Sequence, residues 1–112
     1  MELGVLDHVA IRVEDPVALH GFLTEVLGLE RKGTDTRGLY ALPGGVTLAV
    51  FQVGTEEGGR GERSAPRVPD HLALRASSLG AVRERLSAHG YTLDGDMVMA
   101  PGGLCVQFVT RG

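Results

Sequence analysis

One short segment occurs twice in the chain, as LDHVAIRV at residues 6–13 and as PDHLALRA at residues 69–76. An offset of 63 residues aligns each Asp-His pair, Asp7-His8 with Asp70-His71. Apolar side chains alternate with other side chains in both segments, which is typical of a strand with one buried face. Such a repeat constrains the fold strongly, because it predicts two copies of one structural unit.

A helix is expected after each copy of the segment. Asp15 is a candidate N-cap, followed by a proline, and apolar residues recur at helical spacing until Gly28. In the second half, Ser77 or Ser78 would cap a helix that ends at Gly90.

Three strand-like segments follow each predicted helix. They span 29–32, 39–42 and 46–53 in the first half and 91–93, 97–100 and 104–110 in the second. The last two strands of each half are joined by the same Pro-Gly-Gly turn, which supports the repeat independently. We therefore expect an α+β fold of two tandem βαβββ modules, with a curved mixed sheet around a cavity and the helices outside. The 112 residues suit a single domain, with module 1 at about 1–53, a linker at 54–67 and module 2 at about 68–112.

Composition narrows the class of partner. Eleven basic and 14 acidic residues leave a formal net charge of −3, without a basic cluster, so no nucleic-acid partner is expected. No apolar run approaches the roughly 18 residues of a membrane span, and we expect a cytoplasmic protein without membrane contact. The single cysteine, Cys105, fits a reducing compartment. A small molecule is the expected partner.

The strand faces predict where that molecule binds. Val9, Ile11 and Val13 share the face expected under the helix, so His8 and Arg12 lie on the other face. The same alternation in the other strands adds residues that are too polar for a core and too apolar for a free surface, which is typical of a ligand cavity. The predicted cavity residues are His8, His71, Arg12, Arg75, Thr47, Phe51, Cys105 and Gln107.

Two longer segments resemble a known family. LDHVAIRVEDPVALHGFLTEVLGLE resembles the opening of the glyoxalase, bleomycin-resistance and extradiol-dioxygenase group, the vicinal oxygen chelate superfamily. DHLALRASSLGAVRERLSAHGYTL resembles the start of its second module. The resemblance implies paired βαβββ modules around a cavity, with metal ligands on the first and last strand of each module.

The resemblance implies His8, His71 and Gln107 as the metal ligands. The family pattern has a glutamate four residues after a glycine on each last strand, where this chain has Ala49 and Gln107. Alanine can neither bind a metal nor move a proton, which disfavours the four-ligand glyoxalase and epimerase types. Two histidines and one further ligand resemble extradiol dioxygenases and fosfomycin-resistance enzymes instead, although an amide is a weaker, neutral donor than a carboxylate.

The function implied is that of a small-molecule enzyme, a lyase, isomerase, transferase or oxygenase, that depends on Mn, Fe, Ni, Co or Zn. Its substrate would be small and anionic or enolizable, and Arg12 and Arg75 would recognise the negative charge. Thr47, Phe51 and Cys105 would line the substrate site. A metal-free ligand-binding protein of the bleomycin-resistance type is the alternative, and a structural or regulatory dimer without a ligand is a third.

No catalytic residue is predicted, because no Asp or Glu is expected on the cavity face. Asp7 and Asp70 are expected on the helix-facing side, bonded to a turn or cap. A homodimer is expected, since two short modules leave sheet edges exposed.

Overall fold

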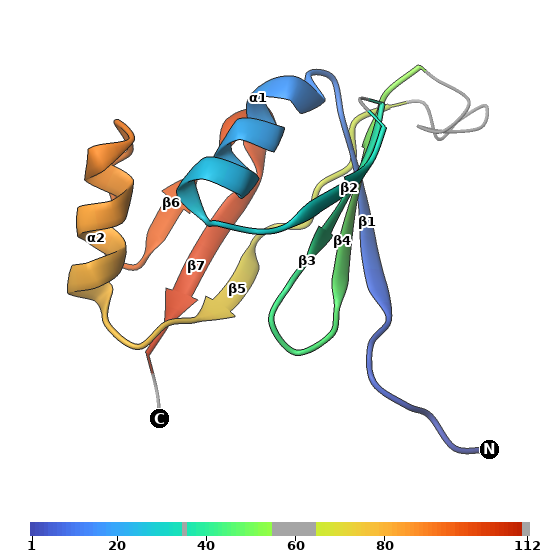
Figure 1. The fold of residues 1–112 in the computed structure, drawn as a ribbon, viewed down its shortest axis with the longest axis horizontal. Helices are drawn as coiled ribbons and strands as arrows, with labels where there is room; N and C mark the ends of the chain where they lie inside the picture. The colour runs from blue at the N-terminus through green and yellow to red at the C-terminus, as the bar shows by residue number, and fades with distance from the viewer. Residues whose placement is uncertain (35, 55–64, 111–112) are drawn as a thin grey trace. The chain divides into compact units, whose positions relative to one another are not determined.

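The computed structural model describes residues 1–34, 36–54 and 65–110. The chain divides into two compact units, Met1–Arg67 and Val68–Gly112. Most of the predicted linker, residues 55–64, lies outside the described residues. Each unit combines a mixed sheet with helix, so the predicted α+β fold of tandem modules is confirmed (Figure 1). None of the described helices is long and apolar enough to cross a membrane.

The first unit contains all the elements of a βαβββ module. In chain order these are β1 (His8–Val13), α1 (Pro16–Gly21), a π-helical turn (Phe22–Val26), β2 (Arg31–Gly33), β3 (Arg37–Ala41) and β4 (Thr47–Gln52). The strands are arranged β1-β4-β3-β2. β1 and β4 run parallel, and the other two pairs are antiparallel. A parallel pair needs a crossover connection, which the helical segment and the β2-β3 hairpin provide.

The first helix begins as its residues predict. The Asp15 carboxylate accepts a hydrogen bond from the Val17 N–H at 3.1 Å, and Pro16 occupies the first turn. The helix packs against β4, and its buried residues include Leu19. Gly28, with a φ of 72°, follows the π-helical turn and ends the helical segment.

The second unit is a shorter module. Its elements are β5 (Leu72–Arg75), α2 (Leu79–Ala88), β6 (Met97–Met99), a 3-10 turn (Pro101–Gly103) and β7 (Cys105–Val109). The strands are arranged β5-β7-β6, with β5 parallel and β6 antiparallel to β7. Ser78, rather than Ser77, caps α2 by accepting a hydrogen bond from the Ala81 N–H at 3.2 Å.

The predicted strand at 91–93 is wrong. Its residues form no strand, and the chain there makes an isolated bridge between Asp94 and Met97. Reciprocal backbone hydrogen bonds of 2.8 and 3.0 Å close a tight turn between these two residues. The chain enters β6 directly from this turn, so the second sheet has one strand fewer than the first.

The Pro-Gly-Gly turns of the two units share their closing hydrogen bond and their glycine conformation. The residue before the proline donates its N–H to the carbonyl oxygen of the residue after the second glycine, at 2.8 Å for Leu42 to Val46 and 2.7 Å for Ala100 to Leu104. Both glycines of each turn have φ values between 80° and 93°. This backbone conformation strongly favours glycine, which explains why both turns contain the same pair of glycines.

The strand faces follow the predicted alternation. On β1, Ile11 and Val13 are buried whereas His8 is exposed. On β7, Val106 and Phe108 are buried, and the alternate residues Cys105, Gln107 and Val109 are half-buried. The apolar faces therefore form the core, as expected from a period of two.

Candidate functional site

The face of the first sheet opposite to α1 carries the candidate site. The ring of His20 on α1 lies 5.5 Å from the ring of Tyr40 on β3, which places Tyr40 under the helix. Residues next to Tyr40 in the strand point to the other side, which we call the pocket face. The strand register sets the side chains of this face in three rows, Arg12-Phe51-Arg37, Ala10-Ala49-Leu39 and His8-Thr47-Ala41.

A pocket with a volume of about 320 Å³ lies on the pocket face. It brings together three of the predicted site residues, His8, Thr47 and Phe51. Its complete lining is Asp7, His8, Ala10, Arg37, Leu39, Thr47, Ala49 and Phe51. Every one of these residues belongs to the first unit.

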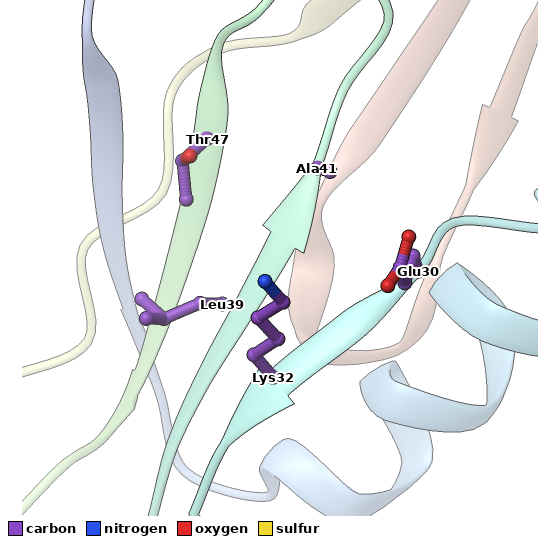
Figure 2. Close-up of a pocket in the computed structure, with 5 residues that line it drawn as sticks. All are labelled: Glu30, Lys32, Leu39, Ala41 and Thr47. Atoms are coloured by element: carbon purple, nitrogen blue, oxygen red, sulfur yellow. The ribbon is translucent and has the colours of Figure 1, made fainter.

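A smaller hollow of about 200 Å³ extends the pocket toward β2 (Figure 2). It shares Leu39 and Thr47 with the larger pocket and adds Glu30, Lys32 and Ala41. A ligand on the pocket face therefore has room to extend toward the Lys32 ammonium group, in addition to the Arg37 guanidinium group of the larger pocket.

The middle of the larger pocket is apolar and its two ends are polar. Ala10 and Ala49 are direct neighbours in the register and form a floor of methyl groups, with Leu39 beside Ala49. Ala49 stands at the position where the family pattern has a glutamate. The floor is consequently flat and uncharged, and the polar groups lie one row away on either side.

Arg37 is a pocket residue that the sequence did not reveal. The strand was expected to begin at residue 39, whereas β3 begins at Arg37. Extending the alternation by one step would have placed Arg37 on the same face as Leu39. The predicted Arg12 is absent from the pocket lining, and its Nε donates to the carbonyl oxygen of Ala65 at 3.4 Å.

The two Asp-His pairs have the same geometry in both units. Asp7 Oδ2 lies 2.8 Å from His8 Nδ1, and Asp70 Oδ2 lies 2.8 Å from His71 Nδ1. The prediction that these aspartates bond to a turn or cap is therefore wrong, because each carboxylate bonds to the adjacent imidazole. The expected helix-facing position is also wrong for Asp7, which lines the pocket on the opposite face. A carboxylate oxygen only accepts, so Nδ1 is the donor and the Nε2 lone pair of the neutral ring can bind a ligand.

These pairs are exposed, with 59% of the His8 side chain and 40% of the His71 side chain accessible to solvent. Pairs with this exposure contribute little to stability. Their effect is on the tautomer and orientation of the ring, which is the role that carboxylates play behind metal-binding histidines.

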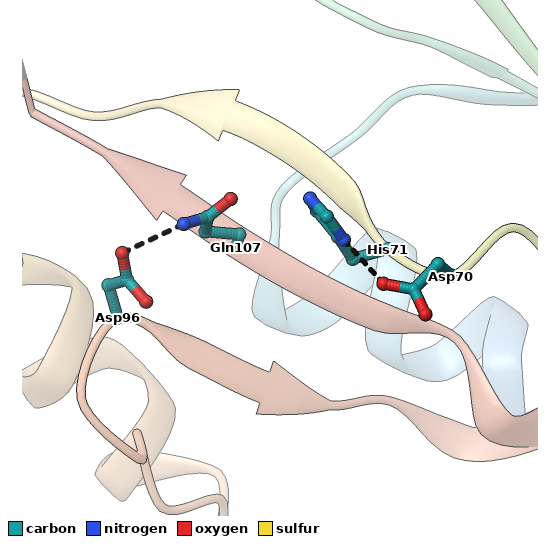
Figure 3. Close-up of polar contacts among 4 residues, drawn as sticks. All are labelled: Asp70, His71, Asp96 and Gln107. Atoms are coloured by element: carbon teal, nitrogen blue, oxygen red, sulfur yellow. Dashed lines mark hydrogen bonds and ion pairs between the residues drawn. The ribbon is translucent and has the colours of Figure 1, made fainter.

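Gln107 has a partner that the sequence did not reveal. Its Nε2 donates to Asp96 Oδ2 at 3.0 Å, in a half-buried contact between β7 and the turn before β6 (Figure 3). The amide oxygen is thereby turned away from Asp96, toward the side on which the His71 ring stands. Asp96 lies in the tight turn before β6, so no strand or helix period could have placed it beside Gln107.

The other predicted residues of the second unit lie on its sheet. Arg75, the last residue of β5, is exposed and pairs in register with Val109. Cys105 begins β7 as a half-buried free thiol.

The first unit offers the Nε2 atom of His8 as a possible donor, and the second unit offers the Nε2 atom of His71 and the amide oxygen of Gln107. Imidazole nitrogen suits Fe, Ni, Co and Zn, and oxygen donors suit Mn. Across residues 1–34, 36–54 and 65–110, no group of three or more His, Cys, Asp or Glu side chains is arranged to hold a metal ion. By chemical type alone, imidazole nitrogen and an amide oxygen are donors that a divalent ion accepts, with the amide in place of a carboxylate.

A comparison with protein families agrees with the fold described above. The profile of the Glyoxalase/Bleomycin resistance protein/Dioxygenase superfamily matches residues 5–109. The chain belongs to this superfamily. A search of the curated proteins found no significant match.

Solved structures of the superfamily type share the fold. A possible glyoxalase from Bacillus cereus aligns with a TM-score of 0.72 and 21% identity, covering 96% of this chain and 99% of that one. TnmS3, an antibiotic binding protein from Streptomyces sp. CB03234, aligns with a TM-score of 0.73 and 17% identity, covering 97% of both chains. A lactoylglutathione lyase from Agrobacterium tumefaciens aligns with a TM-score of 0.70 and 18% identity, covering 96% and 94%. At these identities the likeness establishes the fold alone.

Proposed function

We propose that this superfamily member is a small-molecule enzyme that depends on a divalent metal, with His8, His71 and Gln107 as its ligands. The observation that carries the proposal is the repeated Asp-His pair, with the same 2.8 Å hydrogen bond in each unit. A repeat of the strand alone would conserve the apolar face under the helix. A repeat of the strand alone does not explain why an exposed imidazole has a carboxylate partner in both units.

A bound divalent ion would supply electrophilic stabilisation of negative charge on a substrate oxygen. The residues of this chain would hold and orient that ion. Asp7 and Asp70 keep the proton on Nδ1 of their histidines, and Asp96 holds the Gln107 amide so that its oxygen can bind. Asp7 also lines the pocket, but its Oδ2 accepts from His8, so we assign it no role as a general base.

Metal content decides the proposal. We expect protein purified without chelator, or titrated with Mn, Fe, Ni, Co and Zn in turn, to bind one of these ions. His8→Ala and His71→Ala should each weaken binding by about 10- to 100-fold or more, since each removes a ligand. If the two histidines bind the same ion, the double substitution should add much less than the sum of the single effects.

The matched control is His89→Ala, because His89 is an exposed histidine at the end of α2 without a predicted role. This variant should bind metal like the wild type. The proposal fails if the wild type takes up none of the five ions, or if His89→Ala weakens binding as much as His8→Ala.

The pocket supports a second candidate, a protein that binds a small molecule without metal or catalysis. Its 320 Å³ volume lies at the lower end of the range for ligand sites, and Ala49 leaves its floor without a catalytic carboxylate. The antibiotic binding protein TnmS3 shares the fold. Saturable binding of a small molecule to protein stripped with EDTA, together with no metal uptake, would favour this candidate over the enzyme.

A further inference from the structure

We propose that the pocket of the first unit binds a flat aromatic carboxylate, with the carboxylate at Arg37 and the ring over the Ala10-Ala49 floor. The inference deepens the proposed function, because it names the ligand class of the same pocket. It requires no metal, so it can be tested separately from metal uptake.

The charge at one end of the pocket selects an anion. Arg37 lines the pocket in the row of Phe51, with which it pairs in register. A guanidinium carries five N–H donors and matches the two oxygens of a carboxylate in one plane. It can therefore bind a ligand anion in addition to its contacts within the protein.

The opposite end of the pocket sets the direction of binding. His8 and Thr47 lie two rows from Arg37, and the Asp7 carboxylate is bonded to His8. A carboxylate placed at that end would be repelled by Asp7. The ligand is therefore oriented with its charge at Arg37 and its uncharged end toward His8 and Thr47.

The floor between the two ends selects a flat body. Successive residues on one strand face are about 6.6 Å apart, so a ligand whose carboxylate meets the Arg37 row has its ring over the Ala10-Ala49 row. Neither alanine extends beyond a methyl group, and the register places Leu39 beside Ala49 on the next strand. Phe51, half-buried in the adjacent row, offers an aromatic contact to the edge or face of such a ring.

Three small probes separate the contributions of charge and shape. Benzoate is flat and anionic, cyclohexanecarboxylate is anionic but not flat, and benzamide is flat but uncharged. We expect benzoate to bind the full-length chain in EDTA with a Kd of about 1 mM or below, and each of the other two at least about fivefold more weakly. In a two-dimensional NMR titration, benzoate should shift the backbone amide signals of the pocket residues and leave those of α2 unchanged.

Variants then test the named contacts. Arg37→Gln should weaken benzoate binding by about tenfold or more, and Arg37→Lys by less, because the charge is kept while the planar fork is lost. Phe51→Leu should weaken it by about two- to tenfold while leaving cyclohexanecarboxylate binding unchanged. Arg83→Gln, on the exposed surface of α2, is the matched control and should bind benzoate like the wild type.

Several results would overturn the proposal. Benzoate that fails to bind at about 10 mM, or that shifts signals outside the pocket only, would rule out the site. Equal binding of benzamide would rule out recognition of the charge, and equal binding of cyclohexanecarboxylate would rule out selection of a flat ring. All of these outcomes are measured on the wild-type protein, so the test does not depend on whether a variant folds. Metal uptake with no benzoate binding would reject this inference alone. Benzoate binding with no metal uptake would reject only the metal site.

Discussion

Gly38 on β3 has no room for a side chain. A Cβ atom at this position would lie 2.7 Å from His20 Cε1 and 2.8 Å from the Tyr40 hydroxyl oxygen. Both rings are buried, with exposed fractions of 7% and 0%. Gly38 therefore makes space for the His20-Tyr40 ring pair that joins α1 to the sheet beneath it.

We expect Gly38→Ala to lower the free energy of unfolding by about 1–3 kcal/mol, because neither buried ring can move away without disturbing the core. Gly21→Ala is the control, since nothing lies within 4 Å of its Cβ position and its φ of −58° is helical. That substitution should leave stability unchanged or raise it by up to about 1 kcal/mol. Urea unfolding measures the free energy of unfolding of both variants. An equal decrease in the two would contradict the steric explanation.

The helices of the two units begin with different caps. The Asp15 carboxylate bonds to the N–H two residues later, whereas the Ser78 hydroxyl bonds to the N–H three residues later. Both bonds satisfy a backbone donor that has no partner within its helix. The two helices thus begin at equivalent positions of the repeat, although the capping residue is Asp in one and Ser in the other.

We expect Asp15→Ala and Ser78→Ala each to destabilise the protein by about 1 kcal/mol, because each leaves a first-turn N–H without its side-chain acceptor. Ser77→Ala is a close control, since Ser77 is exposed and precedes the observed cap by one residue. It should change stability by less than about 0.5 kcal/mol. Thermal unfolding followed by circular dichroism would reject the assignment of the cap if Ser77→Ala were the more damaging substitution.

For the whole molecule, each unit has its own sheet and its own Asp-His pair. The edge strands β2 and β6 contain three residues each, and Met99 on β6 is 60% exposed. Unpaired strand edges invite pairing with another chain. The prediction of a homodimer rests on these edges.

We expect light scattering after size-exclusion chromatography to give twice the 11.8 kDa mass of one chain. Met99→Lys on the exposed side of β6 should weaken association if this edge takes part, because an edge lysine opposes pairing. Glu84→Lys, at an exposed residue on α2, is the control. A monomer at every concentration would contradict the prediction.

Local patterns in the sequence determined much of this protein. The repeated segment, the Asp15 cap, the Pro-Gly-Gly turns and the alternating strand faces depend on neighbouring residues, and all were confirmed. These features follow from backbone preferences and from a period of two, which act within a few residues. The missing strand at 91–93 was harder to predict, because whether a short apolar run pairs depends on the length of the turn that follows it.

Only the tertiary structure decided which side chains meet. Arg37 and His8 line one pocket because β4 pairs with β1 on one side and with β3 on the other. Asp96 contacts Gln107 because the turn before β6 lies beside β7 at that point. Such contacts depend on the register between segments far apart in the chain. A periodic pattern specifies the face on which a residue lies, but it carries no information on which residue of a distant strand lies beside it.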